Sequence, residues 1–291
     1  MTDKHLHDGE VVASFGRQYL VESDQHVVWQ CVTRAKRHDL ACGDRVEFLE
    51  TAVGEGVIEK IKDRDNFVRR AAFHRQKNLA ANVTQVAIIT AMDPAFSDEL
   101  VARVIIAATA ESVPVLIVLN KVDLADTYQA RDRLAALVKL GYPLIELAAL
   151  DDILPLRQRL TGERTVLIGQ SGMGKSTIVN ALLPDANAAT NEISKFLASG
   201  RHTTTASRLY RLDHESALID CPGMQEFGLA HLDKSAIAPG FKELDPYLGR
   251  CRFADCRHEA EPDCAVKTAV STGAIDARRF ELFQRITAHP S

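Results

Sequence analysis

Up to about residue 70, short runs of alternating apolar and polar positions are separated by turns that contain Gly, Asp or Ser. Such runs are typical of β-strands, and they predict strands at residues 10–14, 18–22, 27–32, 45–49 and 56–61. Five short strands suit a closed barrel, and we expect an OB-fold, a barrel that often binds oligonucleotides. A barrel that only packs against the rest of the protein is the alternative.

A different pattern begins at residue 85, where continuous apolar runs alternate with helical spacing. Helical periodicity is found at residues 98–110 and 130–140, and the apolar runs have the character of strands buried on both faces. This alternation predicts an α/β domain with a parallel, doubly wound sheet. Its expected strands are residues 85–90, 115–119, 144–147 and 165–168, completed by a hairpin of residues 208–212 and 217–219.

The chain after about residue 230 has its own character. A Cys/His cluster is followed by helical spacing at residues 266–270 and 275–286, where Phe280, Phe283 and Ile286 share one side. We expect a small third domain here.

Composition limits the classes of protein that are possible. The chain has 291 residues, of which 46% are hydrophobic, so it can form several folded cores. No apolar run approaches the roughly 18 residues that a membrane span needs, and residues 1–10 lack an apolar signal-peptide core. We therefore expect a cytoplasmic protein with no membrane partner, whose six cysteines are reduced and serve in metal binding or simple burial.

The formal net charge is only −4, so any surface for nucleic acid would have to be local. Residues 60–77 contain seven Lys or Arg and two Asp, a local net charge of +5 that can neutralise phosphates. A solvated linker is an equally good interpretation of this stretch alone. RNA is favoured by further basic residues on an expected barrel loop: Arg34, Lys36, Arg37 and His38.

A phosphate-binding loop follows the apolar run at residues 165–168. Its glycines allow a tight turn that points backbone N–H groups at phosphates from the start of a helix. We expect Lys175 to neutralise β- and γ-phosphate charge during catalysis and the Ser176 hydroxyl to bind Mg²⁺. The nucleotide-binding residues that match or adjoin the pattern G-x-x-x-x-G-K-[ST] are Gly169, Gln170, Ser171, Gly172, Met173, Gly174, Lys175, Ser176 and Thr177.

A guanine-reading motif, N-K-x-D, is matched by Asn120, Lys121, Val122 and Asp123. Asp123 would accept hydrogen bonds from guanine N1–H and the 2-amino group. Adenine has neither donor, so the aspartate selects GTP over ATP. Ordinary GTPases place this motif after the phosphate-binding loop, and here it comes first. The reversed order predicts a circularly permuted GTPase domain.

A D-x-P-G motif of residues 220–223 follows the expected strand at residues 217–219. We expect Asp220 to hold Mg²⁺ through water and the Gly223 N–H to sense the γ-phosphate. Met224 stands where many GTPases carry the glutamine that orients the attacking water, and a methionine cannot do this.

The polar stretch before this motif offers candidates for the missing catalytic groups. Thr203, Thr204 and Thr205 are candidates for the switch threonine, and Thr204 is our choice as the residue that binds Mg²⁺ when GTP is present. His202 is the candidate for the water-orienting role, although a lone histidine on the surface is more often inert.

The Cys/His cluster predicts a second metal. Cys251, Cys256, His258 and Cys264 offer three thiols and one imidazole, a closed tetrahedral set for one structural Zn²⁺. Such a metal would supply folding energy to a segment too small to build its own core. Buried thiols beside an unrelated histidine are the alternative.

Taken together, these features resemble the RsgA family of GTPases that depend on the small ribosomal subunit, also called the YjeQ family. The residues that carry the resemblance are 169–177, 200–205, 220–227 and 251–264. It implies a circularly permuted GTPase that binds the small (30S) subunit late in its maturation and is stimulated by it to hydrolyse GTP to GDP. It also implies that the barrel and the zinc tail contact ribosomal RNA.

Two positions depart from the family pattern. Ala148 and Ala149 occupy the position of a guanine-contacting S-A motif without its serine, and Gln225 replaces a basic residue that is common after the D-x-P-G-x run. We expect a monomer with an OB-fold barrel at residues 1–72, the GTPase domain at 73–229 and the zinc-binding domain at 230–291. The alternatives are a GTP-responsive RNA-binding clamp with incidental hydrolysis and an ATP-dependent phosphotransferase.

Overall fold

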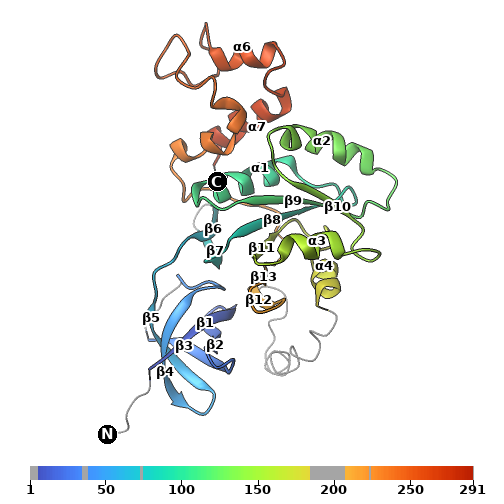
Figure 1. Ribbon diagram of the computed structural model, residues 1–291. Coiled ribbons are helices and arrows are strands. Elements are labelled where there is room, and N and C mark those ends of the chain that lie inside the picture. Colours follow the sequence, from blue (N-terminus) through green and yellow to red (C-terminus); the bar gives the residue numbers. More distant parts are fainter. Residues whose placement is uncertain (1–5, 35–38, 73–74, 184–206, 223, 291) are drawn as a thin grey trace.

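The first strands form a closed barrel. The computed structural model describes residues 6–34, 39–72, 75–183, 207–222 and 224–290. Its first strands are β1 (Leu6–Phe15), β2 (Gln18–Ser23), β3 (Val28–Thr33), β4 (Arg45–Ala52) and β5 (Glu55–Ile61). β1 pairs with both β2 and β4, and β3 runs parallel to β5, which closes the barrel (Figure 1). The predicted strands and the OB-type barrel are confirmed.

A hairpin that the sequence pattern did not predict lies between the barrel and the next domain. β6 (Phe67–Ala72) and β7 (Arg75–Ala81) are antiparallel. Val68 and Leu79 are fully buried in this hairpin, and Ala71 pairs with Leu229 in the segment that follows the D-x-P-G motif. Much of the basic stretch is therefore part of an ordered, half-buried hairpin.

The central sheet has the predicted α/β architecture. Its parallel strands lie in the order β10-β9-β8-β11-β13, and the antiparallel β12 follows β13. The strands are β8 (Gln85–Thr90), β9 (Val115–Asn120), β10 (Leu144–Leu147), β11 (Arg164–Ile168), β12 (Ser207–Arg211) and β13 (Ala217–Asp220). Within β8 and β9 every residue is buried, as the continuous apolar runs predict.

Helices cover both faces of this sheet. Figure 1 shows α1 and α2 on one face and α3 and α4 on the other. Their bounds are α1 (Asp98–Ala110), α2 (Thr127–Lys139), α3 (Leu154–Leu160) and α4 (Lys175–Leu182). The chain passes from β10 through α3 into β11, and this connection puts the strand with the guanine-reading motif before the strand with the phosphate-binding loop.

The carboxyl-terminal segment packs against α1. It consists of the 3-10 turns η1 (Lys234–Ala236), η2 (Ala238–Gly240) and η3 (Lys242–Leu244), then α6 (Ala265–Ser271) and α7 (Ala277–Ala288). The Arg103 guanidinium donates hydrogen bonds of 2.7 and 2.8 Å to the carbonyls of His289 and Pro290. Gly240 approaches α1 so closely that a Cβ there would lie 2.5 Å from Ile106 Cγ1.

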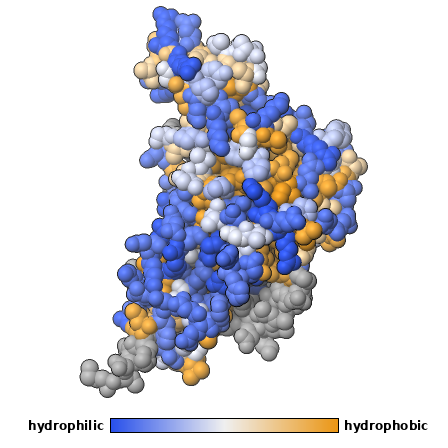
Figure 2. Space-filling view, viewed as in Figure 1, coloured by the Kyte–Doolittle hydropathy of each residue, from blue (hydrophilic) through white to orange (hydrophobic). Residues whose placement is uncertain are grey.

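The surface is mixed in polarity. Figure 2 shows hydrophilic residues over most of one face of the barrel and its junction with the sheet. Among the described residues, no helix has the length and apolar character that a bilayer crossing requires.

Candidate nucleotide site and metal centre

The phosphate-binding loop lies between the carboxyl end of β11 and the start of α4, where its backbone requires glycine. Gly172 and Gly174 have φ values of +86° and +89°, a left-handed conformation that other residues rarely adopt. A Cβ on Gly174 would lie 2.3 Å from Asn120 Nδ2, and one on Gly169 would lie 2.5 Å from the Ile89 carbonyl oxygen. The loop is therefore closely packed against β8 and β9.

Asn120 joins the guanine-reading motif to the phosphate-binding loop. Its side-chain Nδ2 donates a 3.0 Å hydrogen bond to the Met173 carbonyl, and its Oδ1 accepts a 3.1 Å hydrogen bond from the Ala149 backbone N–H. The side chain is only 3% exposed. Because both bonds are internal, Asn120 fixes the distance between the two motifs.

The rest of the guanine-reading motif lies beside this contact. Lys121 Nζ donates a 2.5 Å hydrogen bond to the Asp93 carbonyl, and Lys121 has a φ of +62°. Asp123 follows in the same loop and is exposed, so its carboxylate is accessible to a base. Val122 is half-buried, and its N–H donates to the Leu147 carbonyl.

Lys175 is folded back onto its own loop. Its Nζ donates hydrogen bonds of 2.7 and 3.0 Å to the carbonyls of Gly169 and Gln170. Desolvation lowers the pKa of this ammonium, and the nearby Asp220 opposes that shift. A phosphate in the loop would give the buried cation an anionic partner, which fits the role predicted for Lys175.

Asp220 has an unpaired oxygen at the end of β13. Its Oδ1 is buried and has no hydrogen-bond partner among the described residues. Desolvation raises the pKa of this carboxyl group, although the positive charges of Lys175 and Arg208 oppose the shift. Mg²⁺ and its water would satisfy such an oxygen, while Ser176 is exposed at the first turn of α4, so both predicted ligands fit the ion.

The raised pKa gives a prediction for Asp220→Asn. In the folded state Asp220 holds its proton to a higher pH than in the unfolded chain, so stability falls as pH rises through the folded pKa. We expect the variant without nucleotide or Mg²⁺ to gain about 1 kcal/mol at about pH 8, a few degrees in Tm, and to lose this gain near pH 4. Thermal unfolding across pH checks this.

Asp213→Asn serves as the matched control for this experiment. Hydrogen bonds from the Ser216 side chain and the Glu215 backbone lower the pKa of the exposed Asp213 carboxyl group. Its contribution to stability is therefore present at high pH and is lost as pH falls. A gain in Tm for Asp213→Asn at high pH, or no gain for Asp220→Asn, would contradict the argument.

Several predicted residues cannot be placed. His202, Thr203, Thr204, Thr205 and Gly223 lie outside the described residues.

Met224 is described, and it does not face the solvent. It is 3% exposed, and its N–H donates a 3.3 Å bond to the Gly169 carbonyl. It therefore contributes packing beside the phosphate-binding loop.

Sequence reasoning missed two contacts that shape the loop. Gln170 Oε1 accepts a 2.6 Å hydrogen bond from the Ser97 N–H at the start of α1. The motif leaves the Gln170 position free, so nothing in the pattern pointed to this bond. The contact of Ala149 uses its backbone N–H, which every residue except proline has.

The Cys/His cluster assembles as predicted. The ligand atoms of Cys251, Cys256, His258 and Cys264 all lie within 4.8 Å of one another. Cys251 Sγ and Cys264 Sγ are 3.8 Å apart, and His258 Nδ1 is 3.5 and 3.3 Å from these sulfurs. Two sulfurs on a tetrahedral zinc with bonds of about 2.3 Å would lie roughly 3.8 Å apart. The spacing of the four ligand atoms therefore fits one metal ion.

Electrostatics at this centre also favour a cation. Desolvation and the neighbouring sulfurs of Cys264 and Cys251 raise the pKa of Cys256 to about 11. For Cys251, desolvation is outweighed by hydrogen bonds from the Ala265 and Val266 backbone and from neighbouring thiols, so its pKa is lowered. Thiols this close together become thiolates together only when a metal ion neutralises them. The Lys267 N–H at the start of α6 donates to Cys264 Sγ, which supports negative charge on that sulfur.

Three motifs therefore meet at the carboxyl ends of parallel strands, where α/β sheets bind ligands, and the guanine-reading motif precedes the phosphate-binding loop. This arrangement defines a circularly permuted GTPase. The model of the RsgA GTPase family matches residues 61–230, and the chain belongs to this family. It is a GTP-hydrolysing enzyme, and the resemblance seen in the sequence is confirmed.

Known proteins match nearly the whole length of this chain. A Nitrosospira multiformis protein named small ribosomal subunit biogenesis GTPase RsgA is 47% identical over 96% of this chain and 90% of its own. A Burkholderia pseudomallei protein of the same name is 45% identical over 97% of this chain and 92% of its own. The crystal structure of YjeQ from Thermotoga maritima is 27% identical with a TM-score of 0.73, and the match covers 98% of both chains.

Proposed function

We propose that this GTPase acts in the cytoplasm as a late assembly factor of the small (30S) ribosomal subunit, which binds it and stimulates hydrolysis. Guanine-nucleotide binding is supported above all by the Asn120 side chain, which forms hydrogen bonds with both the phosphate-binding loop and the loop after β10. The choice of the small subunit as the partner is supported by the names of relatives such as the N. multiformis protein, small ribosomal subunit biogenesis GTPase RsgA.

At the nucleotide site, Asp123 reads guanine and the phosphate-binding loop holds the phosphates. In its catalytic role, Lys175 exchanges its hydrogen bonds to the Gly169 and Gln170 carbonyls for bonds to the β- and γ-phosphates. Ser176 and Asp220 hold Mg²⁺, joined by Thr204 when GTP is bound, and Gly223 senses the γ-phosphate. The remaining residues of the proposed nucleotide site are Asn120, Lys121, Val122, Gly169, Gln170, Ser171, Gly172, Met173, Gly174 and Thr177.

The other two segments contact ribosomal RNA in this proposal. They are the barrel, proposed as residues 1–72, and a zinc-binding domain, proposed as 230–291, on either side of a GTPase domain at 73–229. The β6–β7 hairpin spans the first boundary, and Ala71 in β6 pairs with Leu229. One Zn²⁺ bound by the Cys/His cluster fixes the loop before α6, and the protein acts as a monomer.

Stimulation by ribosomal particles tests this function. We expect purified small subunits to raise the GTP hydrolysis rate at least ~10-fold, because a site with buried Met224 has no described group that orients water. The same amount of large subunits is the control, and ATP in place of GTP should give no hydrolysis. Equal rates with both subunits, or with ATP, would contradict the proposal.

A further inference from the structure

The barrel and the GTPase sheet share a strand pairing. β1 of the barrel pairs with β12, with Ala13 opposite Arg208 and Ser14 opposite Ser207. On its other side, β12 pairs with β13, where Arg208 lies opposite Asp220. One row of paired residues thus runs from the barrel, through a single intervening strand, to the proposed magnesium ligand.

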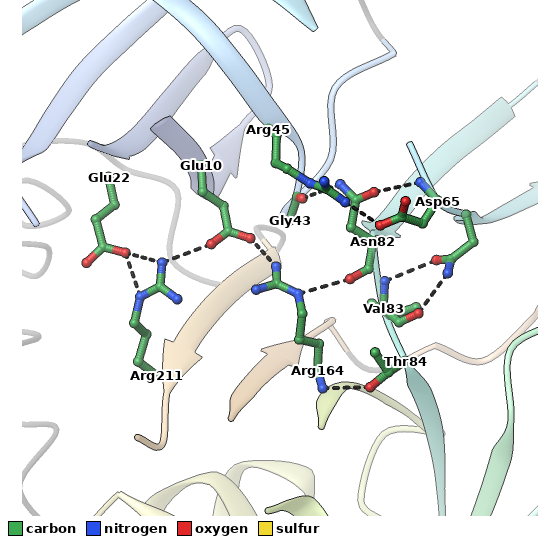
Figure 3. Close-up of polar contacts among 11 residues, drawn as sticks. Glu10, Glu22, Gly43, Arg45, Asp65, Asn82, Val83, Thr84, Arg164 and Arg211 are labelled. Carbon is green, nitrogen blue, oxygen red and sulfur yellow. Dashed lines mark hydrogen bonds and ion pairs between the residues drawn. The ribbon is translucent and has the colours of Figure 1, made fainter. Parts of the chain in front are cut away.

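A group of ion pairs, which we call the clasp, lies at the other end of this junction. It consists of Glu10 of β1, Glu22 of β2, Arg164 of β11 and Arg211 of β12 (Figure 3). Glu10 pairs with Arg164 through Oε1 and with Arg211 through Oε2, the latter at 2.9 Å. Arg211 also contacts Glu22 Oε2 at 2.6 Å. Two barrel carboxylates therefore hold two arginines of the GTPase sheet.

The carboxylates of the clasp are more sheltered than its arginines, since Arg164 and Arg211 are 26% and 35% exposed. The side chains of Glu10 and Glu22 are only 13% and 15% exposed. The Arg164 side chain also donates a 2.9 Å hydrogen bond from Nε to the Asn82 carbonyl. The Arg164 backbone N–H donates a 2.8 Å hydrogen bond to Thr84 Oγ1. Partly buried ion pairs with several hydrogen bonds are screened less by solvent than fully exposed pairs.

Apolar packing does not fill this end of the junction. A pocket of about 560 Å³ opens beside the clasp, and both the barrel and the sheet contribute to its lining. Charged or polar residues such as Asp24, Arg45 and Asn66 line most of it. At this end of β12, Arg211 is therefore joined to the barrel by ion pairs with Glu10 and Glu22, while the apolar contacts of β12 come from residues such as Leu209.

We propose that Glu10 is a positioning residue for the magnesium-binding end of β13. The clasp fixes β12 against the barrel, and β12 in turn holds Asp220 through its pairing with Arg208. A partner that pulls on the barrel would loosen this row and change the affinity for Mg²⁺. The inference rests on the proposed role of Asp220, and it adds a route from the barrel to the nucleotide.

The test uses Glu10→Gln in the full-length protein. Removing the charge should speed hydrogen exchange of the amides at 207–211 at least ~5-fold and raise the Mg²⁺ concentration at the midpoint of binding to fluorescent GDP at least ~3-fold. Arg211→Gln removes the partner from the other domain and should give the same two changes if Glu10→Gln fails to fold.

Asp8→Asn is the matched control. Asp8 lies on the same strand as Glu10 and pairs at 2.7 Å with Lys62 of the barrel, so its loss should change neither measurement. Unchanged exchange in both clasp variants, or faster exchange with an unchanged Mg²⁺ midpoint, would overturn the positioning role. GDP binding by the wild type that does not depend on Mg²⁺ would instead overturn the proposed role of Asp220 itself.

Discussion

Replacing Asp123 with asparagine should weaken GTP binding ~100- to 1000-fold, about 3–4 kcal/mol, and create affinity for xanthosine triphosphate. The carboxylate accepts hydrogen bonds from guanine N1–H and the 2-amino group, and an amide loses one acceptor. Xanthine carries an oxygen in place of the 2-amino group, so the asparagine Nδ2 can donate to it. Competition against fluorescent GDP measures both affinities.

The geometry around Asp123 makes this exchange informative. The backbone before it is held by Asn120 and by the Lys121 bond to the Asp93 carbonyl, so the substitution should change only the base contact. Asp126→Asn is the matched control, because Asp126 is also exposed and makes no cap hydrogen bond to α2. Equal loss of GTP affinity in both variants, or no gain for the xanthine nucleotide, would contradict a guanine-reading role.

Much of the fold could be predicted because the core strands are buried on both faces. β8 and β9 are buried throughout and mostly apolar, and their predicted bounds differ from the observed ones by at most one residue, at the end of β9. The β6–β7 hairpin escaped prediction because Phe67–Ala72 has two adjacent arginines and no regular alternation. Its burial comes from contacts distant in sequence, such as the pairing of Ala71 with Leu229.

The sequence predicted which motifs form the site, but it did not predict the hydrogen bonds that their side chains make. Spacing alone identified the loop and the Cys/His cluster, because a metal or a phosphate imposes its own geometry on the residues that hold it. The internal role of Asn120 depends on the strand order β9-β8-β11, which brings the end of β9 near the loop after β11 and which only the fold determines. The unpaired Oδ1 of Asp220 likewise follows from burial in three dimensions.

The permuted chain order has a visible consequence in the structure. The segment after the D-x-P-G motif continues into a short pairing with β6, where the Ala71 N–H donates to the Gly228 carbonyl and the Ala230 N–H donates to the Ala71 carbonyl. The Leu229 N–H donates at 2.7 Å to the Pro290 carbonyl near the end of the chain. The loop proposed to sense the γ-phosphate is therefore followed within six residues by contacts to the hairpin and to the carboxyl-terminal segment.

Replacing Cys264 with serine should abolish zinc binding and unfold the loop before α6, because apart from the metal the loop is held mainly by exposed polar contacts such as the Arg252–Asp263 ion pair. Residues 252–255 are all exposed, so no apolar core stabilises them. A structural zinc supplies roughly 10 kcal/mol or more of binding free energy to such a segment, and a serine hydroxyl is a poor ligand for it. We expect zinc content to fall from about one ion per chain to nearly none, measured by elemental analysis.

The effect should remain local, which separates metal loss from general unfolding. Arg103 of α1 holds the two residues after α7 through their carbonyls, and Phe283 of α7 packs on Phe241 between η2 and η3. None of these residues is a metal ligand. GDP affinity should therefore stay within ~3-fold of wild type, while amides of residues 249–263 exchange much faster. Cys31→Ala, which removes a buried barrel thiol, should keep the zinc. Full zinc content in Cys264→Ser, or equal loss in Cys31→Ala, would contradict the assignment of these ligands.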